Sequence, residues 1–123
     1  VFEKLYTFYG MRTLEEADPE FHPYYEGAME KRDMAYHQGT VWMFPLGAYY
    51  LAYLKVHAYS ERAKQDVKEQ LEVLECALKE GCIGQLPEIY DGKNPVSSKG
   101  CFAQAWSVGE LLRVYEQIEK KKK

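Results

Sequence analysis

The spacing of apolar residues predicts two consecutive helices in the middle of the chain. Trp42–Phe44 lead into the first, which has Pro45 in its first turn and extends to about Tyr59. It is apolar on nearly every side. Ser60 then stands at the N-cap position of a second helix, whose apolar residues lie on one face and which Gly81 would end. An inner, packed helix followed by an outer, half-solvated one is the repeating unit of an α/α barrel, although a plain helical hairpin in a bundle gives the same pattern.

The remaining segments predict two shorter helices and two loops. A short helix is expected over Val1–Tyr9, with Gly10 following its end, and a last helix from about Ala103 to Gln117. Residues 11–40 show no sustained period but are too apolar for disorder, so we expect a long, ordered, functional loop. Residues 84–100 form a second loop rich in Gly, Pro, Ser and Asn. No stretch alternates as a strand would, so the predicted fold class is all-α, with residues 1–123 as a single segment.

The composition of the chain favours sugar over nucleic acid or a membrane as its partner. Aromatic residues reach 15% and include eleven Tyr and two Trp, which suit stacking against sugar rings, although core packing explains any single Tyr better. A net charge of −3 argues against nucleic acid, and Lys120–Lys123 are expected to be a solvated tail. The longest apolar stretch, Val41–Leu54, is too short and too rich in Tyr for a membrane span.

The supply of ligating residues predicts neither a metal nor a cofactor. The three Cys and three His do not show the spacing of a zinc site, and no serine nucleophile elbow is present. One Cys would be left unpaired by any disulfide, so reduced thiols and a cytoplasmic location are the simplest expectation.

Two segments carry candidate chemistry. The run Arg32–Trp42 brings an Asp, a His, an amide and a Trp together before the apolar helix, and His37 is equally consistent with a structural role and with substrate contact. In the second segment, Glu88 stands between apolar neighbours in a loop. A carboxylate in such a place is a candidate general acid or base. The following Asp91–Gly92 is typical of a turn.

Four segments, in order along the chain, resemble the amylo-α-1,6-glucosidase domain of glycogen-debranching enzymes of the archaeal and bacterial type. They are Gly10–Leu14, Arg32-Asp33 with Ala35–Trp42, Glu88–Gly92, and Gly100-Cys101 with Ala103–Val108. The resemblance implies that the chain is the C-terminal third of an (α/α)6 barrel of twelve helices. The sequence departs from the family pattern at two places. It has Val41-Trp42-Met43-Phe44-Pro45 where the family usually has Val-Trp-Pro-Trp, and it has Leu86-Pro87 before the glutamate.

The resemblance also implies a reaction, the hydrolysis of α-1,6-linked glucose at a branch point with inversion. Glu88 would be the base that activates water, and the general acid would be an Asp upstream of Val1. An inverting pair stands ~6.5–9.5 Å apart to admit the water. By the same resemblance, one set of residues would contact the sugar or orient the base: Arg12, His37, Gln38 and Gln104 at its hydroxyls, Trp42 or Trp106 under its ring, and Gln85 beside Glu88 or its water. Trp106 is also consistent with packing beneath the catalytic loop.

The expected partners are an α-1,6-branched glucan, such as glycogen or limit dextrin, and either the rest of the barrel or a second copy of the chain. Two alternatives stay open. The chain by itself would be an inactive structural, oligomerisation or glucan-binding module, because the acid lies elsewhere. Alternatively, the enzyme would be another (α/α)6 glycosidase, such as a glucoamylase or trehalase relative.

Overall fold

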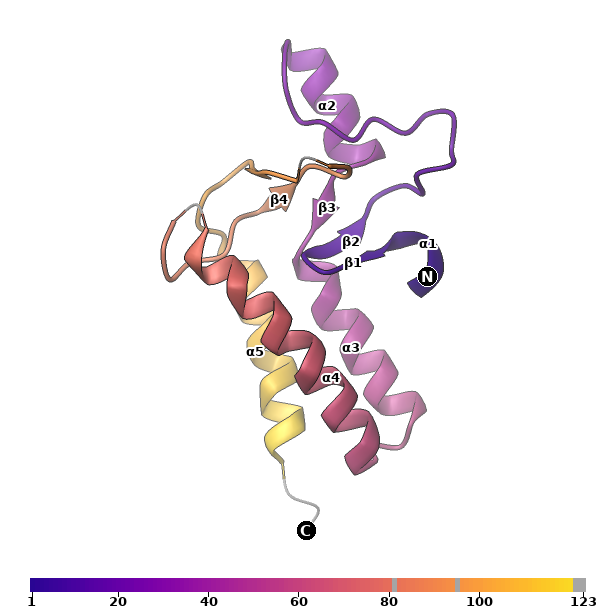
Figure 1. Ribbon diagram of the computed structural model, residues 1–123, viewed down its shortest axis with the longest axis vertical. Coiled ribbons are helices and arrows are strands. Elements are labelled where there is room, and N and C mark those ends of the chain that lie inside the picture. Colours follow the sequence, from indigo (N-terminus) through magenta and orange to yellow (C-terminus); the bar gives the residue numbers. More distant parts are fainter. Residues whose placement is uncertain (81, 95, 121–123) are drawn as a thin grey trace.

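The computed structural model describes residues 1–80, 82–94 and 96–120. Three long helices lie side by side in the lower half of the molecule, a small sheet lies above them, and one further helix rises from the sheet (Figure 1). In chain order the elements are α1 (Phe2–Leu5), β1 (Tyr6–Thr7), β2 (Gly10–Arg12), α2 (Met29–Gln38), β3 (Val41–Trp42), α3 (Phe44–Val56), α4 (Glu61–Leu74), the 3-10 helix η1 (Glu75–Lys79), β4 (Ile89–Tyr90), β5 (Ser98–Lys99) and α5 (Ala105–Glu119).

The sheet has five short strands in sequence order, β1-β2-β3-β4-β5, and every neighbouring pair is antiparallel. At its centre Trp42 of β3 lies opposite Met11 of β2 and Ile89 of β4. The prediction of an all-α fold was therefore wrong in part: the protein is mainly helical but contains a small antiparallel sheet. Strands of two or three residues are too short to show the alternation by which a strand is recognised in a sequence.

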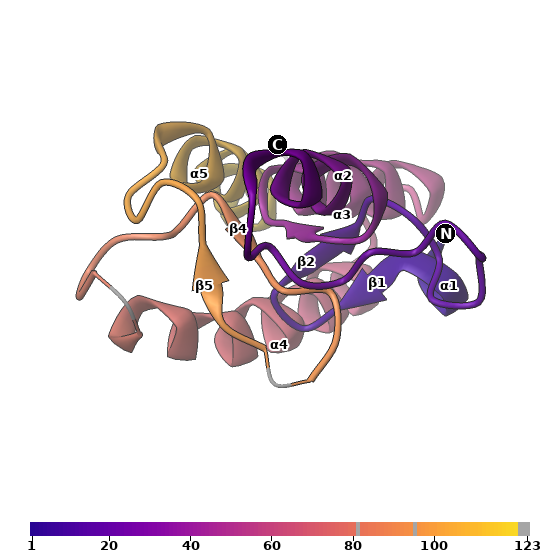
Figure 2. The same ribbon diagram turned by 90° about the horizontal axis from the view of Figure 1, so that it is seen from above.

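Helices α3 and α5 pack closely, as expected for an inner, apolar helix. Their contact depends on Gly47, where an added Cβ would lie 2.6 Å from Glu110 Cβ on α5. Helix α3 also contacts α4 and β2, α4 contacts α5 as well, and Figure 2 shows α4 beneath the other two helices in that view. The core between them consists of large side chains that are almost fully buried: Tyr50, Met43, Leu46, Leu54, Leu71, Val67 and Val114.

Helix α4 confirms the predicted N-cap and the one-sided apolar pattern. Ser60 Oγ accepts a hydrogen bond from Ala63 N at 3.3 Å, and the helix buries Ala63, Val67, Leu71 and Leu74 on a single face. The chain continues as η1 to Lys79. The predicted end at Gly81 and the last three lysines of the tail lie outside the described residues.

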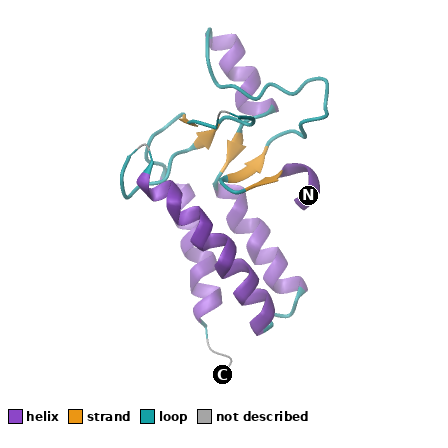
Figure 3. Ribbon diagram, viewed as in Figure 1, coloured by secondary structure: helices purple, strands orange, loops and turns teal. Residues whose placement is uncertain are grey.

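The N-terminal third differs most from expectation. The predicted helix over Val1–Tyr9 ends at Leu5, and the chain then forms the β1–β2 hairpin, so Gly10 is a strand residue rather than a helix terminator. The predicted loop of residues 11–40 contains the ten-residue helix α2. Only Ala35 of α2 is buried, so this helix has no apolar face that its sequence could reveal. Figure 3 shows the loop before α2 running out to one side of the sheet and then crossing the lower end of α2.

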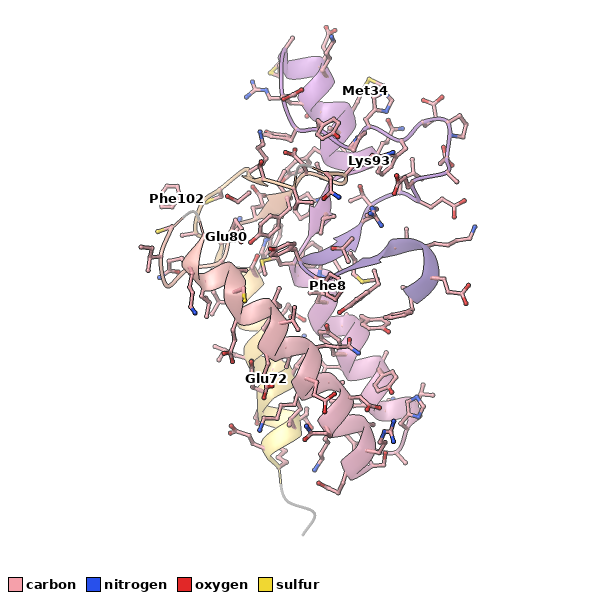
Figure 4. The ribbon with its side chains drawn as sticks, viewed as in Figure 1. Phe8, Met34, Glu72, Glu80, Lys93 and Phe102 are labelled. Atoms are coloured by element: carbon pink, nitrogen blue, oxygen red, sulfur yellow. The ribbon has the colours of Figure 1, made fainter. Side chains whose placement is uncertain are left out.

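Several large apolar side chains are exposed on the surface. Figure 4 labels three of them: Phe8 on the β1–β2 turn, Met34 on α2 and Phe102 before α5. Phe102 is 70% exposed, and Leu112 on α5 is 61% exposed. None of the helices described here combines the length and the apolar character that crossing a bilayer requires.

Candidate functional site

A cavity of about 580 Å³ lies between the sheet, the start of α3 and the first turn of α5. Its size falls within the range of small-molecule sites, and most of its lining is apolar or aromatic. The residues around it are Val1, Leu5, Met11, Arg12, Thr13, Tyr36, His37, Trp42, Phe44, Pro45, Tyr49 and Trp106. Four predicted site residues, Arg12, His37, Trp42 and Trp106, therefore meet at one place although they are far apart in the sequence.

The aromatic wall of this cavity is centred on Trp42. Its ring lies edge-on to Tyr36 at 4.5 Å and 6.0 Å from the ring of Trp106, and Phe44 lies 4.9 Å from Trp106. Trp42 is buried, and its indole N–H donates to the Tyr36 carbonyl and the Thr40 hydroxyl, both at 3.2 Å. Trp106 is 46% exposed, which leaves part of its ring available for a ligand.

Glu88 is half-buried and its carboxylate is held by two donors. Oε1 accepts from the Tyr36 hydroxyl at 2.6 Å, and Oε2 accepts from the backbone N–H of Cys101 at 3.0 Å. Glu88 does not line the cavity directly; Tyr36, which does, connects the two. Each carboxylate oxygen has two lone-pair positions, so both oxygens keep capacity to accept a further proton or hydrogen bond.

The loop that carries Glu88 is fixed on both sides. Glu88 N donates to the Cys101 carbonyl at 2.8 Å, which completes a two-way pairing with that residue. At the start of α5, Gln104 N donates to the Leu86 carbonyl at 2.8 Å and Ser107 Oγ to the Pro87 carbonyl at 2.9 Å. The carboxylate is thus oriented by contacts to α5 and to the segment after β5 rather than by local sequence alone.

Tyr36 keeps its proton over a wide pH range. Burial raises the pKa of the Tyr36 hydroxyl far above its ordinary value, and the hydrogen bond to Glu88 and the charge of Glu88 raise it further. The phenol is therefore a permanent donor to the Glu88 carboxylate at any pH near neutrality.

Arg12 and His37, the two charged or titratable residues predicted to bind substrate, differ in how far they are already engaged by other groups of the protein. Arg12 lines the cavity, but its Nε donates to the Gly92 carbonyl at 2.9 Å and its Nη2 lies 3.6 Å from Glu16. His37 also lines the cavity and its side chain is exposed, with its ring 5.2 Å from that of Tyr36. His37 is thus the more available of the two for a ligand.

The three predicted glutamines are not among the residues that line the cavity. Gln104 is the N-cap of α5, and its side-chain oxygen accepts from Ala105 N at 3.2 Å. Gln85 is exposed on the loop, three residues before Glu88. Gln38 is half-buried in the last turn of α2, where its carbonyl accepts from His22 N at 2.7 Å.

Asp91 is the carboxylate nearest in sequence to Glu88, but it is engaged elsewhere. It is 4% exposed, its Oδ1 accepts from Tyr25 N at 2.9 Å, and its Oδ2 lies 3.8 Å from Lys99 Nζ. Within residues 1–80, 82–94 and 96–120, the cavity lining contains no Asp or Glu, and no group of three metal-ligating side chains converges. Among the described residues, the site therefore offers one carboxylate, Glu88, which is connected to the cavity through Tyr36.

Comparison with protein families matches residues 1–113 to the amylo-alpha-1,6-glucosidase family. The chain belongs to this family. No curated protein and no solved structure gives a significant match. Membership relates the protein to the glycosidases of glycogen debranching, and the match covers every element that lines the cavity.

Two residues of this family member were missed as parts of the site. Tyr36 lies within the run Arg32–Trp42 that resembles the family, yet only the fold brings its hydroxyl to Glu88, 52 residues away. Ser107 is fully buried and donates to the carbonyl of Pro87, which lies directly before Glu88. A serine within an apolar helix is the one sequence signal for such a role, because a buried hydroxyl needs a partner.

Proposed function

We propose that this chain supplies the catalytic base and one wall of the glucose pocket of a glycogen-debranching α-1,6-glucosidase that acts with inversion. The hydrogen-bonded carboxylate of Glu88 beside an aromatic cavity is the observation that carries the proposal. The substrate would be an α-1,6-branched glucan such as glycogen or limit dextrin.

The character of the cavity supports a sugar ligand. A pyranose ring has apolar C–H faces and a rim of hydroxyls, so it fits between an aromatic surface and a few polar groups. Trp106 offers a partly exposed ring, while His37 and Arg12 add polar atoms at the same cavity. We assign Trp106 the ring platform and His37 the principal hydroxyl contact.

The surroundings of Glu88 support a base rather than an acid. Both of its oxygens accept hydrogen bonds, one from the Tyr36 hydroxyl and one from the backbone N–H of Cys101. A carboxylate held in this way is oriented to accept a proton from water through its remaining lone pairs. In the proposed step, Glu88 takes a proton from a water molecule whose oxygen attacks the anomeric carbon, while the bond to the glycosidic oxygen breaks.

The proton for the leaving oxygen would come from a carboxylic acid outside residues 1–123. This assignment is supported by the cavity lining, whose described residues include no carboxyl group, and by the engagement of Asp91 with Tyr25 and Lys99. An acid from another segment would have to stand ~6.5–9.5 Å from Glu88, with room for the water between.

The test is Glu88→Gln in the full-length polypeptide that contains this chain, assayed for glucose release from limit dextrin. Glu72→Gln is the matched control, since Glu72 is an exposed residue of α4 well below the sheet (Figure 4). We expect glucose release to fall by at least about 100-fold in Glu88→Gln and to be unchanged in Glu72→Gln, with glucan binding retained in both. Undiminished release by Glu88→Gln would overturn the proposal.

A second candidate function is supported by the exposed apolar surface. Val1, Phe2, Phe8, Ile83, Phe102 and Leu112 are each more than half exposed. Surfaces of this kind are normally covered by other parts of a protein. On this alternative the isolated chain is an inactive module that associates with other helices or with itself. An isolated chain that forms oligomers in sedimentation analysis and releases no glucose fits this function, whereas a monomer with full activity contradicts it.

A further inference from the structure

We propose that Tyr36 is a positioning residue for Glu88, which it holds in the orientation that the base requires. The inference rests on the proposed function of Glu88 and assigns to Tyr36 no contact with the substrate's reacting atoms. It is carried by the 2.6 Å hydrogen bond between the Tyr36 hydroxyl and Glu88 Oε1.

The short distance is typical of a hydroxyl that donates to an ionised carboxylate. The other oxygen of Glu88 is held by Cys101 N at 3.0 Å, so the two donors together fix the plane of the carboxylate. Without the phenol, the Cys101 N–H would be the one donor that the described residues offer to the carboxylate, which would then be less constrained about its last bond. A base that is displaced by up to about 1 Å loses much of its contribution to the reaction rate.

Tyr36 is itself immobilised by the cavity wall. Its ring contacts Trp42 at 4.5 Å, Tyr25 at 5.9 Å and His37 at 5.2 Å. Its carbonyl accepts from the Trp42 indole and from Thr40 Oγ1. Tyr36 therefore contacts both the Trp42 ring in the cavity wall and the Glu88 carboxylate. These contacts keep the distance between the sugar-binding wall and the base constant.

The other ionisable groups near Glu88 do not replace this donor. Cys101, in the segment after β5, reaches Glu88 through its backbone, while its thiol donates to the Ala103 carbonyl at 3.3 Å. Lys99 on β5 is paired with Asp91 at 3.8 Å. His37 on α2 lines the cavity beside Tyr36. Removal of the phenol therefore leaves one neutral N–H as the described donor to the carboxylate.

The experiment compares Tyr36→Phe with Tyr25→Phe in the full-length polypeptide. Both changes delete one hydroxyl and keep the ring, but among the described residues the Tyr25 hydroxyl makes no hydrogen bond. We expect kcat for glucose release to fall about 10- to 100-fold in Tyr36→Phe with KM changed less than about threefold. Tyr25→Phe should leave both unchanged.

Three outcomes separate this inference from the proposed function. Wild-type kcat in Tyr36→Phe, with Glu88→Gln inactive, would overturn the positioning role and leave Glu88 as the base. A rise in KM with unchanged kcat would also overturn it, since it would show Tyr36 to be a substrate-binding group. Full activity of Glu88→Gln would overturn the proposed function and this inference together. Glucan binding by Tyr36→Phe, measured in parallel, shows that its pocket has formed.

Discussion

Ser107 of α5 and Pro87 of the loop before β4 are joined by a hydrogen bond of 2.9 Å from the Ser107 hydroxyl to the Pro87 carbonyl. Ser107 is fully buried, so its bond is shielded from water. Through this contact the first turns of α5 hold the residue that precedes Glu88. The position of Glu88 thus depends on the packing of the first turn of α5, which also carries the cavity residue Trp106.

Removal of that hydroxyl should lower the stability of the protein. Ser107→Ala leaves the Pro87 carbonyl without its donor in a buried place, and we expect it to lower the free energy of unfolding by about 1–3 kcal/mol. Ser97→Ala, at an exposed residue, serves as the control and should change it by less than about 0.5 kcal/mol. Urea denaturation measures the free energy of unfolding of both variants. Equal stability of the two variants would contradict the anchoring role of Ser107.

The partly exposed ring of Trp106 predicts an effect on binding. Trp106→Ala removes one aromatic surface of the cavity and should raise KM for a branched glucan by up to about tenfold, with a smaller change in kcat. Leu112→Ala, an exposed apolar residue of the same helix that does not line this cavity, is the control. If KM rises equally in both variants, Trp106 is not a platform for the sugar.

Gly100 predicts a steric effect on the base that can be separated from backbone strain. It has a φ of +68°, and a Cβ at this position would lie 2.5 Å from Glu88 Oε2. Gly84 has a similar φ of +77°, but no described atom lies within 4 Å of its Cβ position. Alanine at either site should cost about 1–2 kcal/mol of stability through the left-handed backbone.

Only Gly100→Ala should also reduce kcat, because the new methyl group would displace the carboxylate. Steady-state kinetics and thermal unfolding of the two variants give the comparison. A Gly100→Ala enzyme with the kcat of Gly84→Ala would contradict the placement of the Glu88 carboxylate against this turn.

The sequence was sufficient to predict those elements that bury a continuous apolar face. Helices α3 and α4 were expected from their spacing, with Pro45 and Ser60 near their starts, and both are present. Helix α5 begins at Ala105, within two residues of the predicted start. Helix α2 was missed because ten residues with one buried side chain, Ala35, have no apolar period.

The site was predictable in its composition more than in its geometry. Arg12, His37, Trp42 and Trp106 were expected to act together, and the fold places them at one cavity. The Tyr36–Glu88 hydrogen bond joins a residue on α2 to the residue directly before β4. The pairing of β3 with β4 brings the two together, and such a long-range contact leaves no local pattern in the sequence. The roles of these residues, and of Gln38, Gln85 and Gln104, stay predictions.

The most direct test of Glu88 as the base uses a small anion in its place. In Glu88→Ala the carboxylate is gone, and azide, which needs no deprotonation, should attack the anomeric carbon in place of the activated water. With α-glucosyl fluoride as substrate the fluoride leaves, so no general acid is required. We predict that azide restores turnover of the full-length Glu88→Ala enzyme and that the product is β-glucosyl azide, detected by NMR, with no such product from Glu72→Ala. Hydrolysis by Glu88→Ala at the wild-type rate without azide would contradict the assignment.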